Sequence, residues 1–175
     1  KPLADRAEAL SGIVYLKGMG TMLDRADRLE KLAARVCEET APEAKANARR
    51  AALLCKADLT TAMVYEFPEL QGIMGRIYAG HDEEPDEVCQ AVFEHYQPRF
   101  AGDDLPATAA GAVLALAERA DAIVSCFAVG LAPKGSQDPY ALRRAAIGSL
   151  RILEERGWSF GWTRLLELAA EGVAA

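Results

Sequence analysis

Histidine and cysteine, the side chains that most often bind metals or act as nucleophiles, are scarce in this sequence. There are two histidines and four cysteines, and no two cysteines form a C-x-x-C pair. Zinc sites need closely spaced Cys and His ligands, so the sequence does not predict one. Each cysteine lies in an apolar or helical stretch, and we expect four free thiols in a reducing compartment. The residues are His81, His95, Cys37, Cys55, Cys89 and Cys126.

Motifs for nucleophilic catalysis and nucleotide binding do not occur either. No serine lies in a G-x-S-x-G turn, and neither GK[ST] nor G-x-G-x-x-G is present. The segment Gly18-Met19-Gly20 is too short to hold a phosphate. His95 is a candidate partner for a Cys or Ser, but a structural role beneath the loop 97–106 is the favoured interpretation. The sequence therefore predicts no catalytic site.

Basic side chains are better candidates, because they suit the phosphates of a nucleic acid. Lys134 precedes a predicted helix, and Arg143 and Arg144 lie near the start of that helix. Free N–H groups and the helix dipole favour a phosphate there, although Asp138 would use one or two of these donors. The alternative is that the two arginines form ion pairs with the acidic middle of the chain.

A second candidate site is the loop 97–106, which carries a cation beside an aromatic ring, Arg99 and Phe100. Such a pair suits backbone contacts and base stacking. The net charge of −6 argues against nucleic-acid binding, but the acidity is concentrated in residues 61–133. A phosphate-facing surface is therefore expected from the two ends of the chain, or from Arg76 and Arg99.

The elements that must position these residues are helices, because apolar side chains recur at helical spacing almost throughout. We expect an all-α domain of about eight or nine helices over residues 1–157, and a short helical extension over 158–175. Asp138 and Pro139 are expected to start one helix as N-cap and first residue, and Gly157 to end it. The expected helices cover about 3–16, 21–41, 44–55, 68–79, 85–96, 106–129, 138–156 and 162–170.

Composition and termini indicate a soluble cytoplasmic fragment. About half of the residues are apolar and a quarter are charged, as in ordinary globular proteins. No segment reaches the roughly 20 apolar residues that span a bilayer, and no signal peptide is recognisable. The chain begins at Lys1 without an initiator Met, so we expect it to belong to a longer protein.

Three segments resemble the central part of the beta subunit in the bacterial type of glycyl-tRNA synthetase. The resemblance covers about residues 10–155 and rests mainly on EFPELQGIMGR and GSQDPYALRRAA, which are long and unusual. The three segments are KADLTTAMVYEFPELQGIMGRIYA (56–79), EHYQPRFAGDDLP (94–106) and LAERADAIVSCFAVGLAPKGSQDPYALRRAAIGSLRI (116–152).

The resemblance implies a class II aminoacyl-tRNA synthetase that joins glycine to tRNA(Gly) with ATP and Mg²⁺. Its aminoacylation site belongs to the small alpha subunit, and the large subunit binds and orients tRNA. Two small and two large chains form the heterotetramer. The fragment itself is then expected to hold no cofactor and to perform no catalysis.

The resemblance also implies an HD-like domain, named after metal-dependent phosphohydrolases that use a His, a His-Asp pair and a distant Asp. The pair would follow the apolar run 51–54, where the sequence is Cys55-Lys56-Ala57-Asp58. Either Cys55 and Lys56 replace the pair, or Ala57 replaces the His and Asp58 remains. No His lies in 24–31, whereas Asp121 matches the final Asp.

The expected metal site is thus degenerate, and Lys56 would repel a cation. His81-Asp82 lies in an acidic loop before Pro85 and is not the motif. Three interpretations remain open. The chain is a tRNA-contacting module, or a structural connector without tRNA contact, or a residual HD phosphohydrolase, which is the least favoured of the three.

Overall fold

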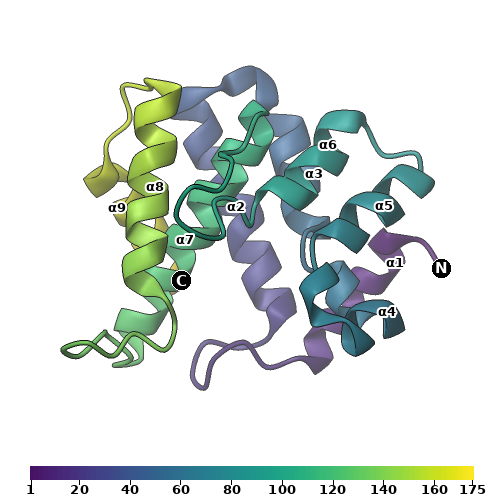
Figure 1. The fold of residues 1–175 in the computed structure, drawn as a ribbon, viewed down its shortest axis with the longest axis horizontal. Coiled ribbons are helices and arrows are strands. Elements are labelled where there is room, and N and C mark those ends of the chain that lie inside the picture. Colours follow the sequence, from purple (N-terminus) through teal and green to yellow (C-terminus); the bar gives the residue numbers. More distant parts are fainter.

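The computed structural model describes residues 1–175 and contains nine α-helices, four 3₁₀ helices and no strand (Figure 1). The predicted all-α fold of about eight or nine helices is confirmed. The α-helices are α1 (Leu3–Ala7), α2 (Met22–Thr40), α3 (Lys45–Leu54), α4 (Ala62–Glu66), α5 (Ile73–His81), α6 (Asp86–Glu94), α7 (Ala109–Ala128), α8 (Leu142–Arg156) and α9 (Trp162–Ala174). The 3₁₀ helices are η1 (Glu8–Gly12), η2 (Pro42–Ala44), η3 (Ala57–Thr60) and η4 (Pro68–Leu70).

Helix α7 is the centre of the fold, since it packs against α2, α3, α6, α8 and α9. Fourteen of its twenty residues are buried, as its Ala-rich sequence requires. Its start is fixed by Thr108, whose side chain accepts a hydrogen bond from the Gly111 N–H. The buried Glu94 in turn accepts hydrogen bonds from the Ala107 and Thr108 N–H groups, which joins the end of α6 to the start of α7.

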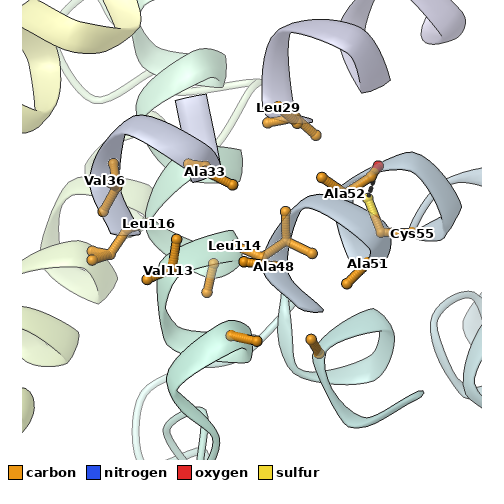
Figure 2. Packing of buried hydrophobic residues seen from close by; sticks show 14 of the residues in the cluster. Leu29, Ala33, Val36, Ala48, Ala51, Ala52, Cys55, Val113, Leu114 and Leu116 are labelled. Carbon is orange, nitrogen blue, oxygen red and sulfur yellow. Dashed lines mark hydrogen bonds between the residues drawn. The ribbon is translucent and has the colours of Figure 1, made fainter. Parts of the chain in front are cut away.

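The main core lies where α2, α3 and α7 meet, and it contains 32 buried residues. Small side chains on α3 face larger aliphatic ones on α2 and α7, so the helix axes approach closely (Figure 2). Ala48, Ala51 and Ala52 are completely buried among Leu29 and Leu114. This close contact fixes the separation between α2 and α7.

Helix α2 begins as its sequence predicts. The Thr21 side chain accepts from the Asp24 N–H, and the Asp24 carboxylate accepts from the Thr21 N–H, which is a complete capping box. At the other end of the chain, Gly157 has a φ of 60° and ends α8 as expected.

Two expected helices are interrupted. The helix expected over 3–16 ends at Gly12, because Tyr15 and Met22 instead pair with Gly20 and Ile13 across a glycine turn. The helix expected from Pro68 breaks at Gly72, where φ is 81° and an added Cβ would lie 2.7 Å from the Tyr96 ring. That residue separates η4 from α5.

Helix α8 starts at Leu142, so the expectation of Asp138 as N-cap and Pro139 as first helical residue is wrong. Residues 139–141 form a turn in which Ala141 is left-handed, with a φ of 54°. The Asp138 carboxylate reaches forward and accepts from the N–H groups of Leu142 and Arg143, at 2.8 and 2.9 Å. Asp138 therefore caps α8 from a distance, which the sequence pattern alone does not distinguish from an ordinary N-cap.

The C-terminal residues 158–175 contribute to the main core. Phe160, Leu165, Leu168 and Ala169 are buried, and α9 packs on α7 and α2. The division into 1–157 and 158–175 stays a prediction. No helix of the fold has the length and apolar composition that a membrane crossing requires.

Candidate functional site

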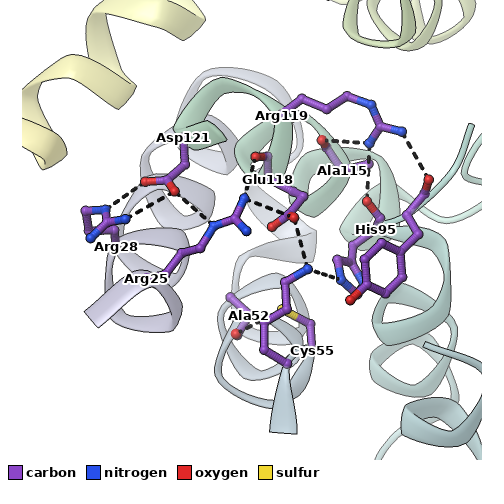
Figure 3. A network of polar contacts seen from close by, with 11 residues as sticks. Arg25, Arg28, Ala52, Cys55, His95, Ala115, Glu118, Arg119 and Asp121 are labelled. Carbon is purple, nitrogen blue, oxygen red and sulfur yellow. Dashed lines mark hydrogen bonds and ion pairs between the residues drawn. The ribbon is translucent and has the colours of Figure 1, made fainter. Parts of the chain in front are cut away.

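A cluster of buried charges joins α2 to α7 (Figure 3). Arg25 forms an ion pair with Glu118 at 3.0 Å and donates to Asp121 at 3.1 Å, and Arg28 donates to the other oxygen of Asp121 at 2.7 Å. Helical spacing explains the geometry, because residues three apart on α2 and on α7 share a face. Both side-chain oxygens of Asp121 are thus used by arginines.

Lys56, which follows α3, brings a third cation to the same carboxylates. Its ammonium donates to Glu118 at 2.9 Å and to the Nε2 of His95 at 3.0 Å, and lies 4.2 Å from the centre of the Tyr96 ring. Lys56 is only 2% exposed. Burial lowers its pKa most strongly, but Glu118 together with Tyr96 and Cys55 more than offsets burial, and the pKa lies above the usual lysine range.

Glu118 and His95 have pKa values that match this arrangement. Burial alone would raise the pKa of Glu118, yet Arg25 and Lys56 hold it well below its usual range, so the carboxylate stays ionised. Burial and the charge of Lys56 hold the pKa of His95 well below its usual value. The ring is therefore neutral, with Nδ1–H donating to the Val92 carbonyl at 2.6 Å.

The residues matched to the HD motif do not point to one common point where a metal ion could bind. Cys55 donates to the Ala52 carbonyl, and Ala57 is buried. Asp58 is buried, and its Oδ2 accepts from the N–H groups of Gly72 and Gly75 at the start of α5. Asp121 is held by two arginines, and no group of three or more His, Cys, Asp or Glu lies together as metal ligands would.

At the predicted phosphate site before α8, the backbone N–H groups that would bind a phosphate are already occupied. Lys134 is exposed, but the first N–H groups of α8 already bind Asp138. Arg143 is exposed and donates to the Gly135 carbonyl at 2.6 Å, while Arg144 is exposed and makes no hydrogen bond. Neither arginine forms an ion pair, in contrast to the alternative of pairing with the acidic middle segment.

The fold brings Arg99 and Arg144, 45 positions apart in the chain, to one cavity of about 290 Å³. Arg119, His95, Tyr96 and Tyr140 also line it. Sequence reasoning missed Arg119 and Tyr140, although an arginine inside the apolar stretch of α7 is a detectable signal. The other four candidates, Lys134, Arg143, Arg76 and Phe100, do not line it. The Arg76 guanidinium lies 4.4 Å from the centre of the Phe93 ring, and Phe100 is 61% exposed.

Comparison with known proteins identifies the family. The family model described as glycyl-tRNA synthetase beta subunit matches residues 1–175. The chain is 53% identical to the glycine–tRNA ligase beta subunit of Ralstonia nicotianae, 49% to that of Desulforamulus reducens and 50% to that of Moorella thermoacetica. These alignments cover 98–100% of this chain and 25% of each relative.

The chain therefore spans about a quarter of the length of the curated relatives it matches. Agreement of this degree over the whole chain extends well beyond the segments that carry the resemblance in the sequence. These matches show that the chain belongs to the glycyl-tRNA synthetase beta subunit family.

Proposed function

We propose that this chain is a tRNA-binding, non-catalytic part of the large subunit of a glycine–tRNA ligase. The observation that carries the proposal is the group of arginines without carboxylate partners at the α8 side of the molecule, namely Arg99, Arg143 and Arg144. A scaffold arginine would normally be paired or removed from solvent, whereas a phosphate-binding arginine must remain available.

The wider assignment rests on the family. We infer that the full-length protein acts in the cytoplasm with an alpha subunit, two copies of each chain forming a heterotetramer. The holoenzyme would attach glycine to tRNA(Gly) with ATP and Mg²⁺, and the alpha subunit would supply the aminoacylation site. The names of the relatives, which are beta subunits of glycine–tRNA ligases, support a partner subunit and a tRNA substrate.

We also infer that the domain is HD-like and that its metal site has been replaced by an internal ion cluster. By the resemblance Asp121 corresponds to the final Asp of the motif, and Arg25 and Arg28 bind its two oxygens. In one of the two possible registers Lys56 takes the place of the Asp of the His-Asp pair, and its ammonium lies 2.9 Å from Glu118. Fixed cations thus supply the positive charge that a metal would bring, which disfavours the residual phosphohydrolase.

Binding of tRNA(Gly) at several salt concentrations tests the main proposal. The full-length protein should bind with a negative slope of log K against log salt, and Arg144→Ala should weaken binding and reduce the slope by about one phosphate contact. Arg143→Ala and Arg144→Ala should each change the stability of the chain by no more than about 0.5 kcal/mol.

A matched control is Arg164→Ala, which removes the same charge at a different place. Arg164 already forms an ion pair with Glu39 on α2, so it is not expected to bind a phosphate. If both arginine variants melt early and keep full tRNA affinity, the connector interpretation replaces the tRNA-binding one. Stoichiometric Mn²⁺ or Mg²⁺ bound by this chain, together with phosphoesterase activity, would instead favour the phosphohydrolase.

A further inference from the structure

The cavity shared by α6, α7 and α8 has a floor of buried polar groups. Arg119 is 7% exposed and donates to four backbone carbonyls, those of His95, Tyr96, Pro98 and Ala115. Figure 3 shows Arg119 and its neighbour Glu118 leaving α7 in different directions. The glycine at position 148 leaves room for the Arg119 side chain, because an added Cβ there would lie 2.9 Å from the Arg119 Nε. The guanidinium is thereby fixed at the junction of the three helices.

The cavity carries an excess of positive charge. None of Arg99, Arg119 and Arg144 lies within ion-pair distance of a carboxylate, although all three line the cavity. Glu118 is the one carboxylate in the lining, and Arg25 and Lys56 already bind it. Burial lowers the pKa of Arg119 only to about 10, so it remains charged at neutral pH. In a chain with a net charge of −6, such a local excess favours an anionic ligand.

The mouth of the cavity offers an aromatic face. Tyr140 is 46% exposed, and no cation lies against its ring. Tyr96, in contrast, is occupied by Lys56 at 4.2 Å and by Arg99 at 5.3 Å. Tyr140 is thus the aromatic side chain of the lining that is available to a ligand. An unpaired base needs such a face, because stacking is the main contact that accepts every base.

We propose that this cavity binds one unpaired nucleotide, with its phosphate between Arg99 and Arg144 and its base against Tyr140. The volume of about 290 Å³ is close to the lower end of small-molecule sites, which suits a single nucleotide. A nucleotide within an RNA strand and a free mononucleotide share this chemistry. We assign the RNA source, an assignment that rests on the tRNA-binding function proposed above.

The test uses the full-length protein and three probes: a fluorescein-labelled single-stranded RNA hexamer, an RNA duplex of the same sequence, and AMP as competitor. The hexamer should bind more tightly than the duplex, and AMP should displace it only at much higher concentration. Arg99→Ala and Arg144→Ala should each weaken hexamer binding about tenfold. Tyr140→Ala should weaken it roughly fivefold to hundredfold, and Tyr140→Phe should restore it.

Arg164→Ala is again the charge control and should leave hexamer affinity within about twofold of wild type. Equal affinity for hexamer and duplex, or no effect of Tyr140→Ala, would overturn the pocket assignment. AMP binding as tightly as the hexamer would also overturn it and identify a free-nucleotide site. If Arg99→Ala and Arg144→Ala weaken tRNA(Gly) binding but Tyr140→Ala does not, this inference fails while the proposed function stands. If tRNA(Gly) does not bind at all, the proposed function fails.

Discussion

At the scale of single residues, the carboxylate of Glu118 balances the charge of two buried cations. Arg25 and Lys56 form ion pairs with the same oxygen of Glu118, Oε1, while its Oε2 is buried without a hydrogen-bond partner. Both cations are more than nine-tenths buried. The cost of burying them is therefore offset mainly through this carboxylate and through Asp121.

Glu118→Gln should destabilise the chain strongly, because two buried cations lose a shared negative charge. We expect the free energy of unfolding to fall by about 3–5 kcal/mol, the usual cost of breaking a buried ion pair. Denaturant titration of the 175-residue chain measures it. Glu155→Gln, at an exposed position on α8 without an ion pair, is the matched control and should change stability by less than about 0.5 kcal/mol.

His95 should make stability depend on pH between about 7 and 5. The pKa of His95 in the folded chain lies well below the unfolded value of about 6.5. Below that pH, His95 therefore binds a proton in the unfolded chain but not in the folded one. The free energy of unfolding should therefore fall as pH drops below about 6.5, by up to roughly 1.4 kcal/mol per pH unit. Glu118 does not interfere, because the stability it contributes is lost only below pH of about 4.

The check is a series of denaturant titrations from pH 7.5 to 5. His95→Gln should flatten the dependence, and His81→Gln should not, since the His81 side chain is 87% exposed. A wild-type chain with constant stability across this range would contradict the assignment of a neutral buried His95.

At the scale of elements, Asp58 links η3 to the start of α5. Its carboxylate accepts from the N–H groups of Gly72 and Gly75, which have no other acceptor within the helix. Asp58→Ala should cost about 2 kcal/mol, and Asp58→Asn, which keeps one acceptor oxygen, should cost less. Hydrogen exchange at Gly75 and the melting temperature report the change. Equal loss for both variants would show that charge, not capping, is the essential contribution.

Element boundaries were predictable where a single side chain sets them locally. Thr21 caps α2 and Gly157 ends α8, and each can be read from neighbouring residues. The start of α8 was not predictable, because Asp138 could cap either at once or from four residues away. The break at Gly72 depends on a partner, Asp58, that lies 14 positions earlier. Local patterns do not contain that information.

At the scale of the whole molecule, α9 covers one side of the core. Phe160, Leu165 and Leu168 are each at least 95% buried, and burying such a side chain is worth roughly 1.5–3 kcal/mol. In a chain ending at Gly157, the lost burial should exceed most of a typical free energy of unfolding, which is about 5–15 kcal/mol. We expect it to lack a cooperative melting transition by circular dichroism.

A chain ending at Gly172 is the control, because it keeps all four buried residues of 158–175 and should melt cooperatively. If the chain ending at Gly157 melts as sharply as the full 175 residues, residues 1–157 are an independent domain. That outcome would support the division expected from the sequence.

The candidate site was only partly predictable, because it is a property of the whole fold. Arg99 and Arg144 were singled out from separate segments, and only the packing of α8 against α7 brings them to one cavity. Arg119 looked like one more helix residue, yet its carbonyl contacts fix the cavity floor. The ion cluster was not predictable either, since its members lie on α2, on α7 and in the turns after α3 and α6, and no periodicity shows that these segments meet.

The ion cluster also constrains the order in which the chain can fold. Arg25 pairs with a carboxylate 96 positions later, Arg28 with one 93 positions later, and Lys56 with one 62 positions later. During synthesis at about 5–20 residues per second, α2 and α3 are complete several seconds before α7 exists. Until α7 emerges these three cations lack the carboxylates that they bind in the fold, and burying them without a counter-charge would cost several kcal/mol per ion. We therefore expect the side of α2 and α3 that carries them to stay exposed to water on the ribosome until α7 is made.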